Sequence, residues 1–364
     1  MKHWLETRAA LDRLAELQKI GKVAALATVV RVRGSAYRHE GAKMLVAEDG
    51  SITGNVSGGC LEADVREVAL GVLRTGTPEL RSYCGSPDEV EAWDLGVGCD
   101  GRVEVLVEVA GDPRTAEWNL LDGTVPFASC VLLENSVSRL VITADGTEGS
   151  LGDPALDVAG SRIARSELGI GAPGIRRIRG RDVFIDLLVP PPQLVIVGAG
   201  EDARPLARFA AEIGFRVIAV DERPALLTPE RFPSAAERIV TRPEHLTSRV
   251  AFVHETYAVV MTHHYARDRE FLRALLDTDA VYIGILGPRS RTDRMLAELS
   301  VAVRVDERRI YGPIGLDIGT DGAEQVALSA LSEILAVRSG RTPASLRERR
   351  AAIHAPSQVT HVGD

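Results

Sequence analysis

The hydrophobic and polar residues at the start of the chain predict one helix followed by several strands. Residues 4–20 place leucine and isoleucine on one helical face, and Gly21 follows where such a helix would end. Residues 23–32 are rich in β-branched side chains and predict a strand. Residues 43–47 and 51–56 predict a hairpin around an Asp-Gly turn. The chain therefore begins as a mixture of helix and sheet.

A cysteine follows this hairpin in the run Val56-Ser57-Gly58-Gly59-Cys60-Leu61-Glu62. The pattern of residues 63–70 predicts a helix with Cys60 in its first turn and Ser57 as its cap. A thiol there would lie near the positive end of the helix dipole and near unpaired backbone N–H groups, an environment that favours the thiolate. Cys60 is thus a candidate reactive or ligand-binding thiol, and the alternative is a small packed cysteine beside a tight turn.

The loop after the first predicted strand, residues 33–41, carries basic side chains among glycines. One interpretation is an anion-binding loop that faces the cysteine turn, with Gly34, Ser35 and Arg38 as candidate contacts; the other is an ordinary solvated loop. A second cysteine, Cys99, lies in a glycine-rich run just before a predicted strand. It is expected either to reach the same face as the first cysteine or to lie in a surface turn.

A weak internal repeat follows. Residues 44–62 resemble residues 140–157 with one gap, and a strand-like segment precedes each copy. In this alignment Cys60 corresponds to Ala155, so the fold would have been duplicated without the thiol. We therefore predict a degenerate repeat at about residues 125–165, and chance similarity between two Asp-Gly hairpins is the alternative.

Residues 189–193 form a proline run and the clearest boundary in the chain. Proline runs are stiff and cannot continue a helix. We therefore predict a domain over residues 1–189, a second domain over 193–340 and a polar tail over 341–364.

The second domain opens with the pattern of a dinucleotide-binding unit. Strand-like residues 194–197 run into a G-x-G-x-x-A turn that contains Gly198 and Gly200, and a second strand ends at Asp221. Such a turn brings the backbone close to a pyrophosphate at a helix N-terminus, and the acidic residue lies where a ribose contact is expected. The alternating strands and helices predict a Rossmann-like, doubly wound parallel sheet, and two acidic residues in the turn count mildly against a phosphate there.

Composition narrows the functional classes. The 364 residues are 45% hydrophobic and 26% charged, with a net charge of −8 and 4% aromatic residues, so neither nucleic acid nor an anionic membrane is an expected partner. Four cysteines without C-x-x-C spacing predict neither a disulfide framework nor a structural zinc site. We find no signal-peptide pattern or apolar run long enough for a bilayer, so the expected location is the cytoplasm.

Taken in order, these motifs resemble the XdhC/CoxI family of xanthine-dehydrogenase accessory proteins over roughly residues 10–340. The matching stretches are Gly34-Ser35 with Gly41, Ser57-Gly58-Gly59-Cys60-Leu61-Glu62, Gly98-Cys99-Asp100-Gly101, Gly198-Ala199-Gly200, Thr262-His263, Gly284-Ile285-Leu286-Gly287 and Pro313-Ile314-Gly315-Leu316-Asp317-Ile318-Gly319. The chain departs from the family pattern at Asp100, where a glycine is common, and at His264, where an acidic residue often follows the histidine.

The resemblance implies a molybdenum-cofactor chaperone that binds molybdopterin, works with a sulfur donor such as a cysteine desulfurase, and passes the cofactor to an apo molybdenum hydroxylase of xanthine or CO dehydrogenase type. Cys60, as molybdenum ligand or sulfur carrier, and Glu62 would carry the chemistry. Soft thiolate suits molybdenum. The cytosine-dinucleotide form of the cofactor would also use the Rossmann-like site. The cofactor-binding residues would be Gly34, Ser35, Arg38, Gly58, Gly59, Cys60, Cys99, Gly198, Gly200, Asp221, His263, Gly284, Gly287, Arg289, Gly315 and Asp317.

Two other functions fit parts of the sequence. An NAD(P)-dependent oxidoreductase would use Gly198, Gly200 and Asp221, although no acid–base pair is evident beside them. A nucleotide sensor or scaffold would use the second domain for dimerisation. For the chaperone, we expect a homodimer in which each cysteine turn faces the partner's Rossmann half.

Overall fold

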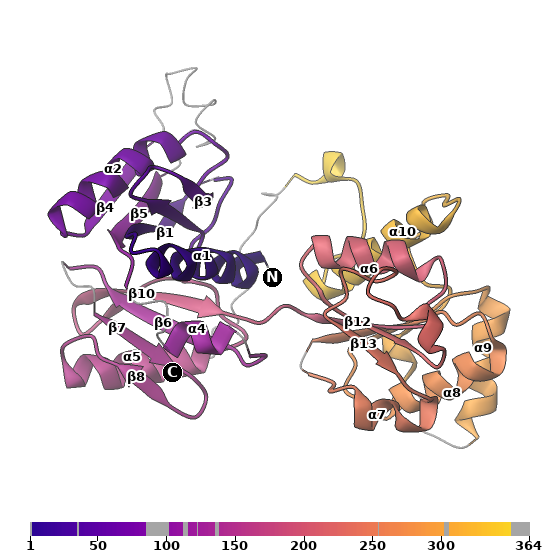
Figure 1. Ribbon diagram of the computed structural model, residues 1–364. Helices are drawn as coiled ribbons and strands as arrows, with labels where there is room; N and C mark the ends of the chain where they lie inside the picture. Colours follow the sequence, from indigo (N-terminus) through magenta and orange to yellow (C-terminus); the bar gives the residue numbers. More distant parts are fainter. Residues whose placement is uncertain are drawn as a thin grey trace. The chain divides into compact units, whose positions relative to one another are not determined.

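The computed structural model describes residues 2–34, 36–84, 102–111, 116–121, 123–134, 138–253, 255–301 and 306–350. The chain divides into two compact units, Met1–Pro191 and Pro192–Asp364 (Figure 1). No described helix is long and apolar enough to cross a membrane.

The first half of the N-terminal unit is a five-stranded antiparallel sheet with one covering helix. Its elements are β1 (Ala24–Arg33), β2 (Lys43–Ala47), β3 (Ile52–Gly54), α2 (Glu62–Thr75), β4 (Glu79–Cys84) and β5 (Arg102–Val109). The strand order is β3-β2-β1-β5-β4. Alternate residues of β1, such as Ala25, Ala27 and Val29, pack with α2 because successive side chains of a strand point to opposite faces.

The second half repeats this arrangement element by element. It contains β6 (Phe127–Leu132), β7 (Arg139–Ile142), β8 (Thr147–Gly149), α5 (Pro154–Glu167), β9 (Gly174–Ile178) and β10 (Arg181–Leu188). The strand order is β8-β7-β6-β10-β9, the same as in the first copy. The predicted internal repeat is therefore confirmed, and it continues through β9 and β10, past the end expected from the sequence.

The two sheets face each other between α2 and α5, which cover the outer faces (Figure 1). Val30 and Leu106 of the first sheet pack against Val131 and Phe184 of the second. Apolar side chains of α1 (Lys2–Lys19) and α4 (Ala116–Leu121) join the same interior. The N-terminal unit is thus a four-layer sandwich in the order helix, sheet, sheet, helix. Its apolar core lies between the two sheets and between each sheet and its covering helix.

Two ion pairs with buried carboxylates join the copies. Lys43 on β2 pairs with Asp186 on β10, and Arg139 on β7 pairs with Glu108 on β5. In the strand registers the two basic residues occupy equivalent positions, and so do the two acidic residues. Reciprocal contacts of this kind indicate an approximate two-fold relation between the copies.

The C-terminal unit is a six-stranded parallel sheet in the order β13-β12-β11-β14-β15-β16. Its strands are β11 (Gln193–Val197), β12 (Arg216–Asp221), β13 (Glu237–Val240), β14 (Thr256–Val260), β15 (Tyr282–Ile285) and β16 (Ile310–Tyr311). Its helices are α6 (Ala203–Glu212), α7 (Leu246–Arg249), α8 (Tyr265–Leu276), α9 (Arg289–Ser300) and α10 (Ala323–Ser339), with short 3-10 turns at Pro224–Leu226, Pro243–His245, Glu307–Arg309 and Leu346–Glu348.

Helices α6 and α10 lie on one face of this sheet, and α7 and α8 lie on the other (Figure 1). Side chains of β11, β12, β14 and β15 pack with α7, α8 and α9 in one large apolar cluster. This strand order, with helices on both faces, is the Rossmann arrangement, and the predicted fold is confirmed. Strand β16 was not predicted because two residues carry no readable pattern.

Candidate functional site

The cysteine turn differs from the predicted one in where the helix begins. Helix α2 starts at Glu62, so Cys60 precedes the helix instead of lying in its first turn. The Ser57 hydroxyl oxygen accepts hydrogen bonds from the backbone N–H groups of Gly59, Cys60 and Leu61 at 3.0–3.1 Å. Ser57 therefore caps a separate tight turn, and this turn holds the half-buried cysteine at its end.

Glu62 closes the same network from the helix side. Its carboxylate accepts hydrogen bonds from the N–H groups of Val56 and Ser57 at 3.1 and 2.8 Å, and from the Ser57 hydroxyl at 2.5 Å. Burial acts to raise the pKa of Glu62, but these hydrogen bonds outweigh it and the pKa is lowered. Glu62, expected from the sequence to carry chemistry with Cys60, holds the turn in this structure.

The sequence predicted unpaired N–H groups around the thiol, and this was wrong, because Ser57 already accepts from three of them.

The space beside Cys60 is created by glycine. Gly59 has a φ of +120°, and a Cβ there would meet nothing within 4 Å. A side chain would strain that backbone and fill that space. The turn therefore leaves room for a ligand atom to approach beside the thiol.

The loop after β1 contacts the cysteine turn through Tyr37. The Tyr37 ring lies 3.4 Å from where a Cβ of Gly58 would be, and the residue as a whole is 70% exposed. Arg38 is bound to Glu6 of α1 through both guanidinium ends, which reduces its capacity for an anion. A cavity of about 160 Å³ lies here, lined by His3, Glu6, Tyr37, Arg38, His39, Glu40 and Ala42.

The sequence also predicted that Gly34, Ser35 and Cys99 would contact a ligand near the thiol. Gly34 adopts a φ of +77° in an exposed loop, a conformation that favours glycine. Ser35 and Cys99 lie outside the described residues.

The second copy keeps the carboxylate that holds the turn, but the segment at the position of the cysteine is different. Asp157 takes the part of Glu62 and accepts from Leu151 N–H and the Ser150 hydroxyl at 2.7 Å. Its helix, however, already begins at Pro154, and Asp153 caps it by accepting from Ala155 N–H at 2.8 Å. Ala155 therefore stands inside a helix where the first copy places Cys60 on a glycine turn.

Equivalent glycines fix this alignment. Gly54 and Gly149 have φ values of +83° and +87°, and a Cβ at either would overlap the carbonyl oxygen of Lys43 or Arg139, respectively. Each ends the third strand of its copy. Counting from these glycines, Cys60 and Ala155 occupy the same position, as the sequence comparison indicated.

In the C-terminal unit, Gly198 and Asp221 hold the predicted nucleotide turn. A Cβ on Gly198 would lie 2.5 Å from the Met261 carbonyl oxygen, so only glycine lets β11 pass the end of β14. The buried Asp221 carboxylate accepts from Ala199 N–H at 2.7 Å and from three N–H groups of Arg223 at 2.8–2.9 Å. Burial acts to raise the pKa of Asp221, but the Arg223 and Ala199 hydrogen bonds lower it.

Arg223 thus occupies the oxygen atoms that a ribose would use. A ribose diol at Asp221 would have to displace the Arg223 side chain, which is 56% exposed. We did not anticipate this arginine, although a basic residue two positions after the acidic one was visible in the sequence.

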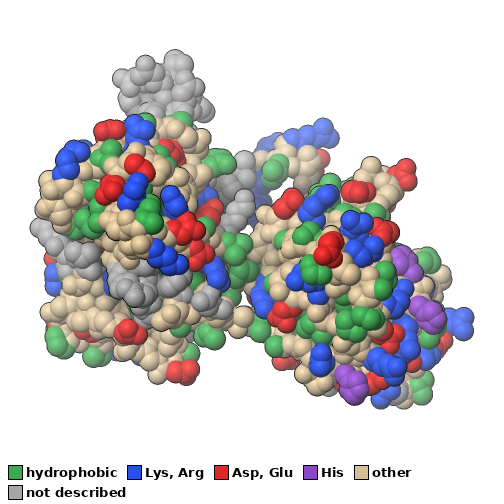
Figure 2. All heavy atoms as spheres, in the orientation of Figure 1, with side chains coloured by type: hydrophobic (Ala, Val, Ile, Leu, Met, Phe, Trp, Pro, Cys, Tyr) green, Lys and Arg blue, Asp and Glu red, His purple; other side chains and the backbone are tan. Residues whose placement is uncertain are grey.

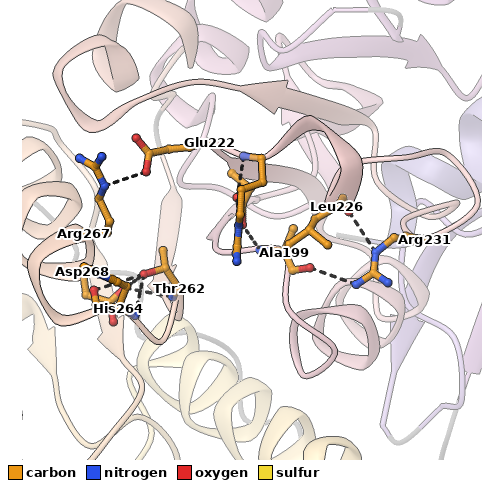
Figure 3. Close-up of polar contacts among 10 residues, drawn as sticks. Ala199, Glu222, Leu226, Arg231, Thr262, His264, Arg267 and Asp268 are labelled. Carbon is orange, nitrogen blue, oxygen red and sulfur yellow. Dashed lines mark hydrogen bonds and ion pairs between the residues drawn. The ribbon is translucent and has the colours of Figure 1, made fainter.

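Arg231 holds the turn from the other side (Figure 3). Its guanidinium donates to the carbonyl oxygens of Leu226 and Ala199, both at 3.2 Å. It also pairs with Glu201 at 2.7 Å, and Arg204 pairs with the same carboxylate. The acidic charge that counted against a phosphate at this turn is therefore largely balanced at Glu201.

Asp268 organises the end of β14 (Figure 3). Its buried carboxylate accepts from Thr262 N–H at 3.0 Å and the Thr262 hydroxyl at 2.5 Å. It also pairs with Arg291 at 2.6 Å. His263 pairs separately with Asp202 at 2.7 Å. Among the described residues, no group of three or more His, Cys, Asp or Glu side chains is placed to hold a metal ion. Asp268 and Arg291 therefore fix backbone geometry here.

Gly200 and three other predicted glycines meet protein atoms closely. A Cβ on Gly200 would meet Asp202, and a Cβ on Gly284 would overlap Ile314. Gly287 and Gly315 adopt φ values of +126° and +102°. Gly287 and Gly315 are required by backbone conformation and Gly284 by packing, whether or not a ligand binds, whereas the atom nearest Gly200 is the movable end of the Asp202 side chain.

Arg289 and Asp317 are exposed. Figure 2 shows Lys and Arg side chains mixed with acidic ones on this unit. On α8 and α9 such charges are paired, as in Arg269–Glu298 and Arg294–Glu298. This surface is therefore not a purely basic patch.

The fold and both turns define a class of protein in which a duplicated α+β unit, with a thiol turn in its first copy, precedes a Rossmann sheet. Residues 17–84 match the XdhC and CoxI family, and residues 194–334 match the XdhC Rossmann domain. The chain is 36% identical over 334 residues to a Bacillus subtilis protein named as a probable xanthine dehydrogenase subunit, covering 90% of this chain and 96% of that protein. The chain belongs to the XdhC/CoxI family, as the sequence motifs indicated.

Two further similarities extend over nearly the whole chain. The "Molybdenum cofactor insertion chaperone PaoD" of Escherichia coli is 28% identical over 338 residues, covering 91% of this chain and 88% of that protein. A crystal structure of a xanthine dehydrogenase from Bacillus halodurans is 29% identical with a TM-score of 0.74, covering 93% of this chain and 98% of that one.

Proposed function

We propose that this protein binds the molybdenum cofactor as cargo, takes part in its sulfuration and delivers it to a molybdenum hydroxylase of the xanthine dehydrogenase type. The observation that carries the proposal is the turn of the first copy, where Ser57 and Glu62 position Cys60 beside an open glycine. The second copy retains the carboxylate of this frame but has Ala155 in place of the thiol.

The donor chemistry suits this cargo. Molybdenum is bound well by soft sulfur ligands, and Cys60 presents a thiol at the edge of a rigid turn. The other described cysteines are less suitable: Cys130 is fully buried, and burial raises its pKa to about 12, while Cys84 accepts a hydrogen bond from Arg102 at 3.3 Å. We propose Cys60 as the group that contacts the metal or its sulfur.

The names of relatives support the same class of activity. One relative is named a molybdenum cofactor insertion chaperone, and others carry the name xanthine dehydrogenase. We infer that the client is an apo hydroxylase of that type and that a cysteine desulfurase supplies the sulfur. A homodimer remains a prediction, as does use of the Rossmann unit by the cytosine dinucleotide form.

An NAD(P)-dependent oxidoreductase is less well supported. Its ribose contact, Asp221, is filled by Arg223 and Ala199, so binding would begin with the loss of several hydrogen bonds. Calorimetric titration with NADH and NADPH distinguishes the two functions. Tight binding together with turnover of a small substrate would favour the oxidoreductase.

The test of the proposed function is cofactor retention. Wild-type protein and Cys60→Ala are purified without air from cells that make the cofactor, and bound molybdenum and pterin are measured per chain. Cys84→Ala is the matched control because that thiol is exposed. We expect Cys60→Ala to lose bound cofactor and Cys84→Ala to keep it. Equal retention by wild type and Cys60→Ala would contradict the proposal.

A further inference from the structure

We propose that an arginine-lined cleft between the two copies of the repeat binds a phosphate or pyrophosphate group. The cleft has a volume of about 430 Å³. Its lining residues come from the end of β1, from the loop that follows it, and from β9 and β10 of the second copy. They are Val30, Arg31, Val32, Arg33, Glu40, Pro173, Gly174, Ile175, Arg176, Arg177 and Asp182.

The guanidinium groups in this cleft differ in how firmly they are held. Arg176 is bound to Glu167 through two hydrogen bonds of 2.8 and 3.0 Å, so it is the least available. Arg31 and Arg177 share one carboxylate, Asp182, at 3.8 and 3.0 Å. Arg31 also pairs with the buried Glu104 beneath it.

Arg33 is the group best placed to meet a ligand. It is exposed, and within the described parts of the chain no acidic side chain pairs with it. Glu40, the other acidic residue of the lining, already accepts from Val32 N–H at 2.9 Å. An entering anion would thus meet Arg33 and the exposed Arg177 first. Forked guanidinium groups suit phosphate oxygens because they donate paired hydrogen bonds.

The repeat shows that the fold does not require an arginine at every one of these positions. In the strand registers, Arg176 and Arg177 of β9 are equivalent to Arg81 and Ser82 of β4. Strand β1 ends in Arg31-Val32-Arg33, whereas Leu133 and Glu134 follow β6. Arg176 therefore has a basic counterpart in Arg81, whereas Arg177 corresponds to a serine and the segment after β6 carries no arginine at Leu133 or Glu134. The additional arginines at this end of the sandwich favour a ligand there.

The cleft opens at the same sheet edge as the cysteine turn. Strands β1 and β3 run in the same direction because each is antiparallel to β2, so the segments that follow them lie at one edge. The loop from Arg33 leads to Tyr37, which covers Gly58 of the turn. If the cargo is molybdopterin, its phosphate end would occupy this cleft while its metal end lies towards Cys60. This ligand assignment rests on the proposed function; phosphate binding by the cleft does not.

The experiment is calorimetric titration of the full-length protein with inorganic pyrophosphate. Arg33→Ala/Arg177→Ala is compared with Arg81→Ala, which removes a 49% exposed arginine from β4, the counterpart of β9 in the first copy. The loss of one charge-assisted hydrogen bond weakens binding by about tenfold or more, so we expect the double variant, which lacks two guanidinium groups, to bind more than tenfold more weakly. Arg81→Ala should bind as wild type does. Thermal unfolding confirms folding of all the variants.

Absence of pyrophosphate binding to wild type would overturn the inference, and so would unchanged affinity in the double variant or an equal loss in Arg81→Ala. Cys60→Ala separates this result from the proposed function. It should bind pyrophosphate with wild-type affinity even if it loses molybdenum. If pyrophosphate binds as expected but no variant or wild-type protein retains molybdenum, the cleft stands and the chaperone function fails.

Discussion

The two copies of the N-terminal repeat share a frame and differ at the positions that bear chemistry. Both have the same strand order, a glycine of positive φ at the end of the third strand and a carboxylate folded back onto the following turn. Only the first has a thiol at this turn, where Cys60 follows two glycines; the second has Ala155 at the same position, within a capped helix. The fold therefore does not require a cysteine at this position.

The second copy retains roles that are visible in the structure. It covers the inner face of the first sheet, supplies Asp186 to the buried Lys43, and places Arg177 at one end of the sandwich. The difference between the copies teaches that one copy can serve as a scaffold while the groups that we propose to bind ligands lie in the other copy and in the cleft between the copies. Substitutions in the ion pairs and in the two turns can test this comparison.

The largest effect is expected from breaking the ion pairs that join the copies. Asp186→Asn leaves Lys43 buried without its carboxylate, and both side chains of that pair are under 10% exposed. Loss of one partner of such a pair costs about 3–5 kcal/mol of unfolding free energy. Equilibrium denaturation in urea measures this cost.

Glu108→Gln makes the equivalent change in the other pair. Arg139 is 27% exposed and can regain water, so we expect a smaller loss than for Asp186→Asn. Equal losses would show that exposure does not distinguish the two ion pairs, and no loss in either would contradict an interlocked sandwich.

Removing the capping side chain of each turn should distinguish an effect on stability from an effect on cofactor binding. Ser57→Ala and Asp153→Ala each remove acceptors from backbone N–H groups, and each should cost about 1–2 kcal/mol by denaturation. Only Ser57→Ala should also reduce bound molybdenum, because only its turn positions Cys60. Equal molybdenum contents in these two variants would count against a special role for the first turn.

The smallest effect is a pH dependence at Glu62. Since its folded pKa is lowered below the ordinary 4.5, its contribution is present above that pH and disappears as the pH falls through the folded pKa. The carboxylate is partly solvated, so this contribution is at most about 1 kcal/mol. Urea denaturation of wild type and Glu62→Gln should differ at pH 7 and converge in acid. A difference that grows in acid would contradict the assignment.

The sequence predicted the fold class because its signals were local. Two Asp-Gly hairpins revealed the repeat, and a glycine turn between short apolar strands revealed the Rossmann unit. Strands β9 and β10 escaped the repeat comparison because only their alternation is shared with β4 and β5, and no turn motif accompanies it. The pattern of apolar residues survives divergence better than any single side chain does.

The details of the sites depended on contacts between distant residues. Helix α2 begins later than predicted because Ser57 and Glu62 hydrogen-bond to each other. The cleft joins residues of β1 and β9 that are over 140 positions apart, so no local pattern indicated it. The arginine beside Asp221 was close in sequence, but its binding mode depends on backbone geometry.

The most direct test of the central claim moves the thiol between the copies. Molybdenum and pterin per chain are measured in wild type, in Cys60→Ala and in Cys60→Ala/Ala155→Cys, all purified without air. We predict that wild type retains cofactor and that both variants lose it, because a thiol at position 155 would lie in a helix without the glycine turn. Retention by Cys60→Ala at the wild-type level would contradict the assignment of cofactor binding to Cys60.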